Sequence, residues 1–307
     1  MSTFDPDALE CLAAIVEEGG FERAAQRLSI TQSAVSQRLR SLEAQVGTVL
    51  IVRSRPLKAT PAGQLMLKHA KMMRLLRADL EHDLRELAPN SARGQRDEDR
   101  VSVAINADSI ATWALPAVSA LVRGGLPVEI IHDDQDFTHE WLREGQVMGC
   151  VTSLGQALRG CRLEPLGAMP YVAVASPAFM AEALPDGLTR HNFHQVPFIA
   201  FNRKDDLQRD FVCRAFSLAQ VTLKQLYVPS SEGQVRAAHA SWGVTVVPRP
   251  LVAAALAEGS LVNVRPALTY HVPLFWHCWN LASDVLDRLS AALREAATTS
   301  LDPITPR

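Results

Sequence analysis

Residues 21–40 constrain the fold most, because two short amphipathic helices lie there with almost no room between them. Apolar side chains recur on the inner side of both helices, namely Ala25, Leu28, Val35, Leu39 and Leu42. Ser29 ends the first helix, and the Thr31 hydroxyl is placed to cap the second. This pattern predicts a helix-turn-helix, a motif whose second helix lies in the major groove of DNA.

The outer face of the second helix offers short polar, amide and basic groups. The residues that we expect to contact DNA there are Thr31, Gln32, Ser33, Ser36, Gln37 and Arg40. Glutamine can pair with adenine, and arginine with guanine or phosphate. Residues 20–77 hold eleven basic side chains against Glu22 and Glu43, a local net charge of +9, whereas the whole chain has −2. This excess predicts a phosphate-binding surface; an ordinary helix pair with a solvated polar face is the alternative.

A basic hairpin is predicted beside this motif. A helix begins at Asp5-Pro6 and stops at Gly19-Gly20, and after Gly47 residues 49–52 read as a strand. Residues 53–60 then return as a hairpin, which makes residues 1–60 a winged helix-turn-helix domain. Arg53 and Arg55 are the expected wing contacts to DNA, with two solvated arginines as the alternative.

A long helix is predicted over residues 61–88, beginning at Thr60-Pro61. Its apolar stripe consists of Leu65, Met72, Leu76, Leu80, Leu84 and Leu87. Such a stripe is a candidate dimerisation seam, although packing against the helix's own domain would account for its first turns. Residues 89–100 are polar and predict a linker.

The remaining residues, 101–307, alternate short apolar strands with helical stretches, which predicts an α/β domain with a largely parallel sheet. The expected strands are 101–105, 128–132, 147–151, 171–175, 198–201, 243–248, 261–264 and 274–277, with helices near 110–122 and 285–297. We expect two lobes linked by crossing strands, lobe 1 at about 101–163 and 268–307, lobe 2 at about 164–267. Ligands in such sheets bind at the carboxyl ends of the strands.

Two strand-to-helix junctions in this part are rich in polar groups. The candidate ligand-binding residues are Asn106, Asp108, Ser109, Asp134, Ser230, Ser231 and Glu232. A helix N-terminus binds a carboxylate, and acidic side chains neutralise an amine or guanidinium. The set fits a zwitterion with an additional positive charge, such as L-lysine or L-arginine. Helix capping is the simpler alternative.

Several classes of protein are not expected. Residues 1–6 lack a basic start and an apolar core, and no run of about 18 apolar residues predicts a membrane span. The five scattered cysteines suggest reduced thiols in a cytoplasmic protein. Neither a metal-ligand spacing nor a nucleotide or nucleophile motif is present, so we expect no metal, no cofactor and no enzyme.

The motifs also resemble a known family. Phe21–Leu28, Thr31–Leu39, Leu42-Glu43 and Thr60–Gly63 are similar to the DNA-binding half of LysR-type transcriptional regulators. Residues 20–26, 103–113 and 228–232 resemble the arginine/lysine-responsive subgroup, the ArgP and LysG types, which control export of basic amino acids. Ser33 departs from the proline that many members of the wider family have at this position, which puts the base preference at that point in doubt.

The resemblance implies a homodimer or tetramer of winged-helix domains, with an effector domain like a periplasmic binding protein. It also implies base contacts by Gln32, Ser33 and Ser36 and a wing contact by Arg53. The leading hypothesis is a sequence-specific regulator of double-stranded DNA whose effector is L-lysine or L-arginine, with RNA polymerase as a further candidate partner. The alternative is a low-specificity architectural or replication-origin DNA-binding protein.

Overall fold

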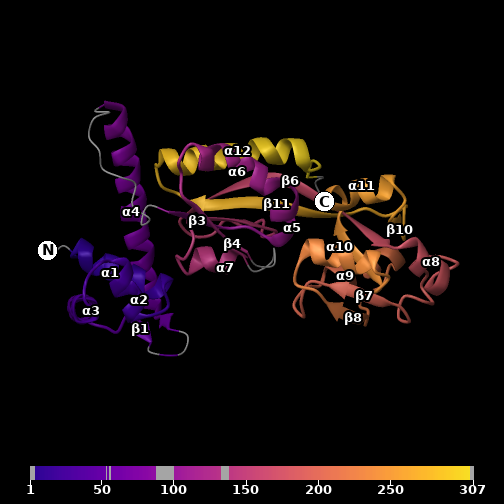
Figure 1. Cartoon of the computed structure of the whole chain (residues 1–307), viewed down its shortest axis with the longest axis horizontal. Helices are drawn as coiled ribbons and strands as arrows, with labels where there is room; N and C mark the ends of the chain where they lie inside the picture. The colour runs from indigo at the N-terminus through magenta and orange to yellow at the C-terminus, as the bar shows by residue number, and fades with distance from the viewer. Residues whose placement is uncertain (1–3, 53, 55–56, 88–99, 133–137, 305–307) are drawn as a thin grey trace.

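A DNA-binding domain, one long helix and an effector domain make up the chain in the computed structural model (Figure 1). The structure describes residues 4–52, 54, 57–87, 100–132 and 138–304. Arg53, Arg55 and Asp134, which the sequence singled out, lie outside these residues. The long helix stands between the two domains and contacts both.

Three helices form the DNA-binding domain: α1 (Pro6–Glu17), α2 (Phe21–Arg27) and α3 (Gln32–Val46). The Asp5 side chain caps α1 by accepting from the Asp7 N–H, with Pro6 in the first turn. Between α2 and α3 the backbone of Ser29 is left-handed, with φ 54°. The apolar side chains predicted to face inward are buried, except that Leu28 is half-buried. The helix-turn-helix is therefore confirmed.

The wing is shorter than the sequence predicted. Strands β1 (Ile51–Val52) and β2 (Lys58–Ala59) pair antiparallel. The predicted strand began at residue 49, but the N–H of Leu50 donates to the Glu43 carboxylate at 2.9 Å, so the strand starts only at Ile51. A Cβ atom at Gly63 would lie 2.0 Å from the carbonyl oxygen of Leu50. Glycine is required there because the following helix passes so close to the wing.

Helix α4 (Pro61–Leu87) packs against the core of the DNA-binding domain and against the core of the effector domain. Leu67 and Ala70 belong to the core of the DNA-binding domain, whereas Leu75 belongs to that of the effector domain. Met72, which the sequence placed in the dimerisation stripe, also packs against the effector core. Within the described ranges, α4 included, no helix combines the length and apolarity needed to cross a membrane.

Part of the predicted apolar stripe on α4 is exposed. Leu65, Leu76, Leu80 and Leu84 are between 45% and 72% exposed. The side chain of Leu87 lies outside the described residues. These four leucines form an exposed apolar row along α4.

The effector domain contains strands β3–β11 and helices α5–α12. The strands are β3 (Val101–Ala104), β4 (Val128–Ile131), β5 (Gly149–Thr152), β6 (Cys161–Ala175), β7 (Pro197–Ala200), β8 (Lys224–Tyr227), β9 (Val244–Pro248), β10 (Val262–Asn263) and β11 (Tyr270–Trp279). The helices are α5 (Ala107–Ser109), the π-helical turn η2 (Ile110–Ala114), α6 (Leu115–Arg123), α7 (Thr138–Arg143), α8 (Pro177–Ala183), α9 (Leu207–Phe216), α10 (Ser231–His239), α11 (Arg249–Ala257) and α12 (Asp284–Ser300).

The strands form one sheet that is mixed rather than largely parallel. Its order is β4-β3-β5-β11-β6-β9-β7-β8, with β10 also paired to β6. Pairing is parallel among β3, β4 and β5 and among β7, β8 and β9, but antiparallel wherever β6 or β11 takes part. Strands β6 and β11 are long because they cross between the lobes. The expected lobe boundary at residues 163–164 therefore falls within β6.

Two local predictions differ from the structure. The predicted helix at residues 110–122 begins three residues earlier and contains the π turn η2. Pro116 has no N–H for the carbonyl four residues before it, which favours a widened turn at this point. Strand β8 was not predicted, because its sequence Lys-Gln-Leu-Tyr at the sheet edge lacks an apolar run.

Candidate DNA interface and ligand pocket

Helix α3 presents the predicted DNA-contacting side chains at the surface. Gln32, Ser33, Gln37 and Arg40 are exposed, and Ser36 is half-buried. The opposite side of the helix packs into the domain core through Val35, Leu39 and Leu42. An exposed polar face on a helix fixed by its apolar face is the arrangement that a recognition helix needs.

The start of α3 is held by its own side chains. The Thr31 hydroxyl accepts from the Ala34 N–H at 3.2 Å and lies 2.9 Å from the Ser33 hydroxyl. Thr31 is therefore the helix cap that the sequence suggested, and its role in DNA contact stays a prediction. Arg38, which shares the helix, pairs with Asp7 of α1 at 3.0 Å.

The positive charge of residues 20–77 does not all belong to the DNA surface. Lys71 and Arg74 are buried on α4, and both pair with Glu17. Arg27 also pairs with Glu17, at 2.7 Å. The predicted phosphate-binding surface of eleven basic residues is wrong for Lys71 and Arg74, because both are buried against Glu17, an acid of α1 outside the counted window.

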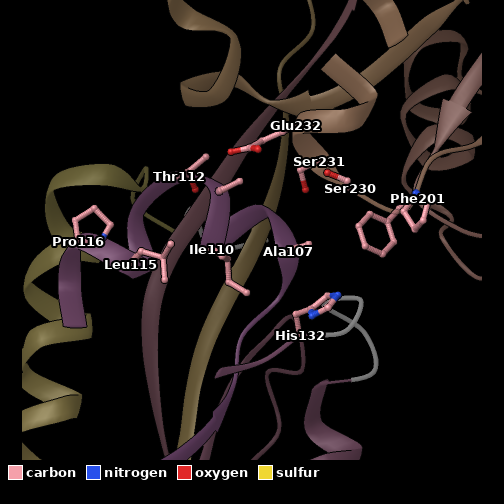
Figure 2. A pocket seen from close by; sticks show the side chains of 12 residues that line it. Ala107, Ile110, Thr112, Leu115, Pro116, His132, Phe201, Ser230, Ser231 and Glu232 are labelled. Carbon is pink, nitrogen blue, oxygen red and sulfur yellow. The ribbon is translucent and has the colours of Figure 1, made fainter. Parts of the chain in front are cut away.

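A pocket opens between the two lobes of the effector domain, with a cavity volume of about 590 Å³ (Figure 2). It is lined by Ala107, Ile110, Ala111, Thr112, Leu115, Pro116, His132, Phe201, Pro229, Ser230, Ser231 and Glu232. Its position follows from the topology. Ala107 and His132 follow the parallel strands β3 and β4, and Phe201 follows β7, so the pocket lies at carboxyl ends of strands in both lobes.

Asp108 joins the two lobes next to this pocket. Its carboxylate accepts a hydrogen bond from the Ser231 hydroxyl of lobe 2 at 2.6 Å. The second oxygen accepts from the Tyr171 hydroxyl of the crossing strand β6 at 2.7 Å. Asp108 is thus bound by neutral donors on both sides, which stabilise its charge less than a cation would.

Electrostatics at this site favour a positive ligand. Burial raises the pKa of Asp108 above its ordinary 3.8, the two hydroxyl donors lower that pKa, and the negative charge of Asp205 raises it again. The net direction is upward because burial outweighs the hydrogen bonds. Asp205 itself is buried and accepts from the Phe201 and Leu207 N–H groups. Among the described residues, Glu232 in the lining and Asp108 and Asp205 beside it give the pocket an acidic surrounding.

The other predicted ligand residues divide into caps and unsatisfied groups. Ser230 caps α10 by accepting from the Gly233 N–H at 3.1 Å, as the capping alternative held. Asn106 and Ser109 are buried, and neither the Asn106 Oδ1 nor the Ser109 Oγ has a hydrogen-bond partner in the described structure. Unsatisfied buried polar atoms are costly and often mark functional sites.

Sequence reasoning missed His132, Phe201, Tyr171 and Asp205. His132 and Phe201 are the last residues of the predicted strands 128–132 and 198–201, and each directly follows an observed strand, β4 or β7, so the strand-end rule could have found both. Tyr171 begins a strand that the sequence did predict, but its contact with Asp108 spans 63 residues. No local pattern carries that pairing.

The described residues contain no group of three or more histidine, cysteine or acidic side chains arranged to hold a metal ion. All five cysteines are free thiols. Burial raises the pKa of the Cys150 and Cys11 thiols, which keeps them protonated and unreactive. Nothing in their arrangement supports chemistry at sulfur.

Comparison with known protein families accounts for both domains. Residues 6–64 match the model of the bacterial regulatory helix-turn-helix proteins of the lysR family. Residues 94–298 match the model of the LysR substrate binding domain. Together these matches include the helix-turn-helix, the wing, and both walls of the pocket.

Individual relatives are similar along almost the whole chain. The transcriptional regulator LysG of Mycobacterium tuberculosis is 41% identical over 294 residues, covering 96% of this chain and 94% of the relative. ArgP of Aeromonas salmonicida is 38% identical over 304 residues, covering 99% and 100% of the two chains.

Solved structures agree with the sequence matches. A crystal structure of ArgP from Mycobacterium tuberculosis superposes with a TM-score of 0.83 at 40% identity, covering 99% of this chain and 100% of that one. Full-length LysG from Corynebacterium glutamicum with bound effector Arg has a TM-score of 0.72 at 32% identity, covering 97% and 100%. The chain therefore belongs to the LysR family of bacterial regulatory helix-turn-helix proteins and is a DNA-binding transcriptional regulator.

Proposed function

We propose that the pocket between the lobes binds L-arginine or L-lysine and that binding controls how the protein engages its operator. The observation that carries this proposal is the acidic surroundings of the pocket, where the buried Asp108 carboxylate accepts from two neutral hydroxyl groups, those of Tyr171 and Ser231, and Glu232 lines the cavity. A guanidinium or ammonium group would supply the missing positive charge. The bound effector Arg in the related LysG structure supports the same ligand class.

The opposite end of the ligand would meet the start of α10. Ser230 and Ser231 lie at the N-terminus of this helix, where the partial positive charge of the helix attracts a carboxylate. The unpartnered Asn106 and Ser109 lie at the strand-to-helix junction of the other lobe. A zwitterion with a third charge would thus contact both lobes, and its differential affinity for the closed arrangement would shift the population of states.

DNA contact is proposed for Thr31, Gln32, Ser33, Ser36, Gln37 and Arg40, with Arg53 and Arg55 from the wing. The exposed leucine row of α4 supports a homodimer or tetramer, in which two recognition helices would meet paired half-sites. We include RNA polymerase as a partner at the promoter. The regulated genes would be those of basic amino acid export or metabolism, as in the resembling subgroup.

Calorimetric titration with L-arginine, L-lysine and L-citrulline tests the ligand proposal. Citrulline has the shape of arginine but a neutral urea group, so we expect binding at least about 10-fold weaker, the loss of a charge-assisted hydrogen bond of roughly 1.5–3 kcal/mol. Asp108→Asn should remove most of the preference for arginine over citrulline. Equal binding of both ligands, or no binding of either basic amino acid, would refute the proposal.

A further inference from the structure

Three parts of the chain meet at a partly buried cluster of charged and polar groups. The cluster, here called the Lys71 junction, consists of Glu17 of the DNA-binding domain, Lys71 and Arg74 of α4, and Ser102, Glu129 and Gln146 of lobe 1. A small polar cavity of about 60 Å³ lies among these residues. Its walls therefore come from both domains and from the helix between them.

Lys71 is the residue that contacts all three parts. Its side chain is 5% exposed, and its Nζ lies 3.4 Å from a Glu17 carboxylate oxygen. The same ammonium group donates to the backbone carbonyl of Gln146 in lobe 1. Burial lowers the pKa of Lys71, and the charge of Glu17 opposes that change. A buried ammonium needs these partners, because a buried charge left uncompensated is strongly destabilising.

Close packing accompanies this ionic contact. Gly145 has a φ of +71°, and a Cβ atom placed on it would lie 2.9 Å from the Cβ of Lys68 and 3.2 Å from its Cα. The loop before β5 therefore rests directly on the backbone of α4. Farther along the same helix, Leu75 enters the effector core and Asp79 accepts from the Val285 N–H of α12. Lobe 1 therefore contacts α4 at several separate points along the helix.

The parallel strands β3 and β4 connect this junction with the ligand pocket. Ser102 and Glu129 lie in the first half of the two strands, where the Ser102 hydroxyl donates to Glu129 at 2.6 Å. Ala107 and His132 follow the other ends of the strands and line the pocket. A four-residue strand spans about 13 Å. A change at the pocket end is therefore separated from the junction by one rigid strand length.

We propose that the Lys71 junction fastens lobe 1 to the DNA-binding domain of the same chain and transmits the ligand state of the pocket to that domain. The contacts of Lys71 and Gly145 support the fastening whether or not the pocket binds the proposed effector. The transmission rests on the proposed effector function. The two arrangements would be a closed junction, as observed, and an open one in which lobe 1 leaves α4.

Two variants disturb the junction by different physical means. Lys71→Met removes the bond to Gln146 and one positive charge, while Glu17 keeps Arg74 and Arg27 as partners and is not left unpaired. Gly145→Ala adds a methyl group against the backbone of Lys68 at a left-handed position. His69→Gln is the control, because His69 is exposed on the same helix.

Hydrogen–deuterium exchange of the full-length protein without ligand measures the fastening. We expect residues 144–148 and α1 to exchange at least about tenfold faster in both junction variants, whereas the control exchanges like the wild type. Circular dichroism confirms that each variant is folded. Wild-type exchange in both junction variants would overturn the fastening.

DNA binding with and without saturating L-arginine measures the transmission. For the wild type, the ratio of the two DNA dissociation constants should differ from one, and in both junction variants it should return to within about twofold of one. Calorimetry should show arginine affinity unchanged within about threefold. A wild-type ratio that persists in both variants overturns the transmission. Failure of arginine to bind the wild type would instead refute the proposed function, and the exchange experiment would still decide the fastening.

Discussion

Replacing Glu17 with glutamine should destabilise the protein strongly and in a pH-dependent manner. Burial by itself would raise the pKa of Glu17, but the positive charges of Lys71, Arg74 and Arg27 outweigh it and lower the pKa from 4.5 to about 2. That difference corresponds to roughly 3 kcal/mol in favour of the folded state at pH 7. Because the folded pKa is lowered, this stability is present above pH 4.5 and is lost as the pH falls through about 2.

Urea unfolding of wild type and Glu17→Gln at one protein concentration would measure this contribution. We expect the difference in unfolding free energy to be roughly 3 kcal/mol at pH 7 and about 2 kcal/mol at pH 3.5. The matched control is Glu18→Gln, since Glu18 is the neighbouring acid, its side chain is 35% exposed, and it pairs with Arg27 at 3.2 Å. Its loss should stay within about 1 kcal/mol. Equal losses for the two variants, or a Glu17 difference that does not change with pH, would refute the reasoning.

Three further predictions concern other surfaces. Gln32→Ala should cost roughly 1–3 kcal/mol of discrimination at one base pair in a DNA-binding selection, whereas Gln26→Ala on α2 should leave the preferred sequence unchanged; an unaltered preference in the first variant would remove Gln32 from the base contacts. Leu80→Lys should lower the oligomeric state seen by sedimentation, and Leu226→Lys, exposed on lobe 2, should not; a wild-type assembly in both would exclude the leucine row as the seam. Cys150 is buried, and burial raises its pKa, so iodoacetamide should modify it only after denaturation; rapid labelling of the native protein would contradict this.

The helices of the DNA-binding half could be predicted from the sequence because their signals are local. Caps such as Asp5 and Thr31 satisfy N–H groups two or three residues away, and the apolar spacing of α3 marks its buried face. The strands of the effector half were also recognisable as apolar runs. Strand β8 was missed because an edge strand need not be apolar. The Thr60–Gly63 motif could be identified by its resemblance to the family. Why residue 63 must be glycine became clear only from the position of the Leu50 carbonyl oxygen in the folded chain.

The ligand pocket was predicted in part. The strand-to-helix junctions at residues 106–109 and 230–232 do face one another across the lobes, and Asp108 meets Ser231 over 123 residues of sequence. The sequence could not distinguish Ser230, which caps α10, from Ser231, which reaches the other lobe. Both are serines at the start of one helix, and only the direction of each side chain separates their roles.

The sequence by itself determined the helices of the DNA-binding half and most strands of the effector half, because hydrogen bonds and apolar periodicity within a few residues mark those segments. It also determined the family, through the pattern of α2 and α3. Only the tertiary structure decided where the charges act. Lys71 and Arg74 looked like part of a phosphate-binding surface, yet they are buried against Glu17 more than fifty residues away. The residues next to a charged side chain in the sequence do not reveal its ionic partner, because Coulomb attraction depends on distance and burial in the folded chain.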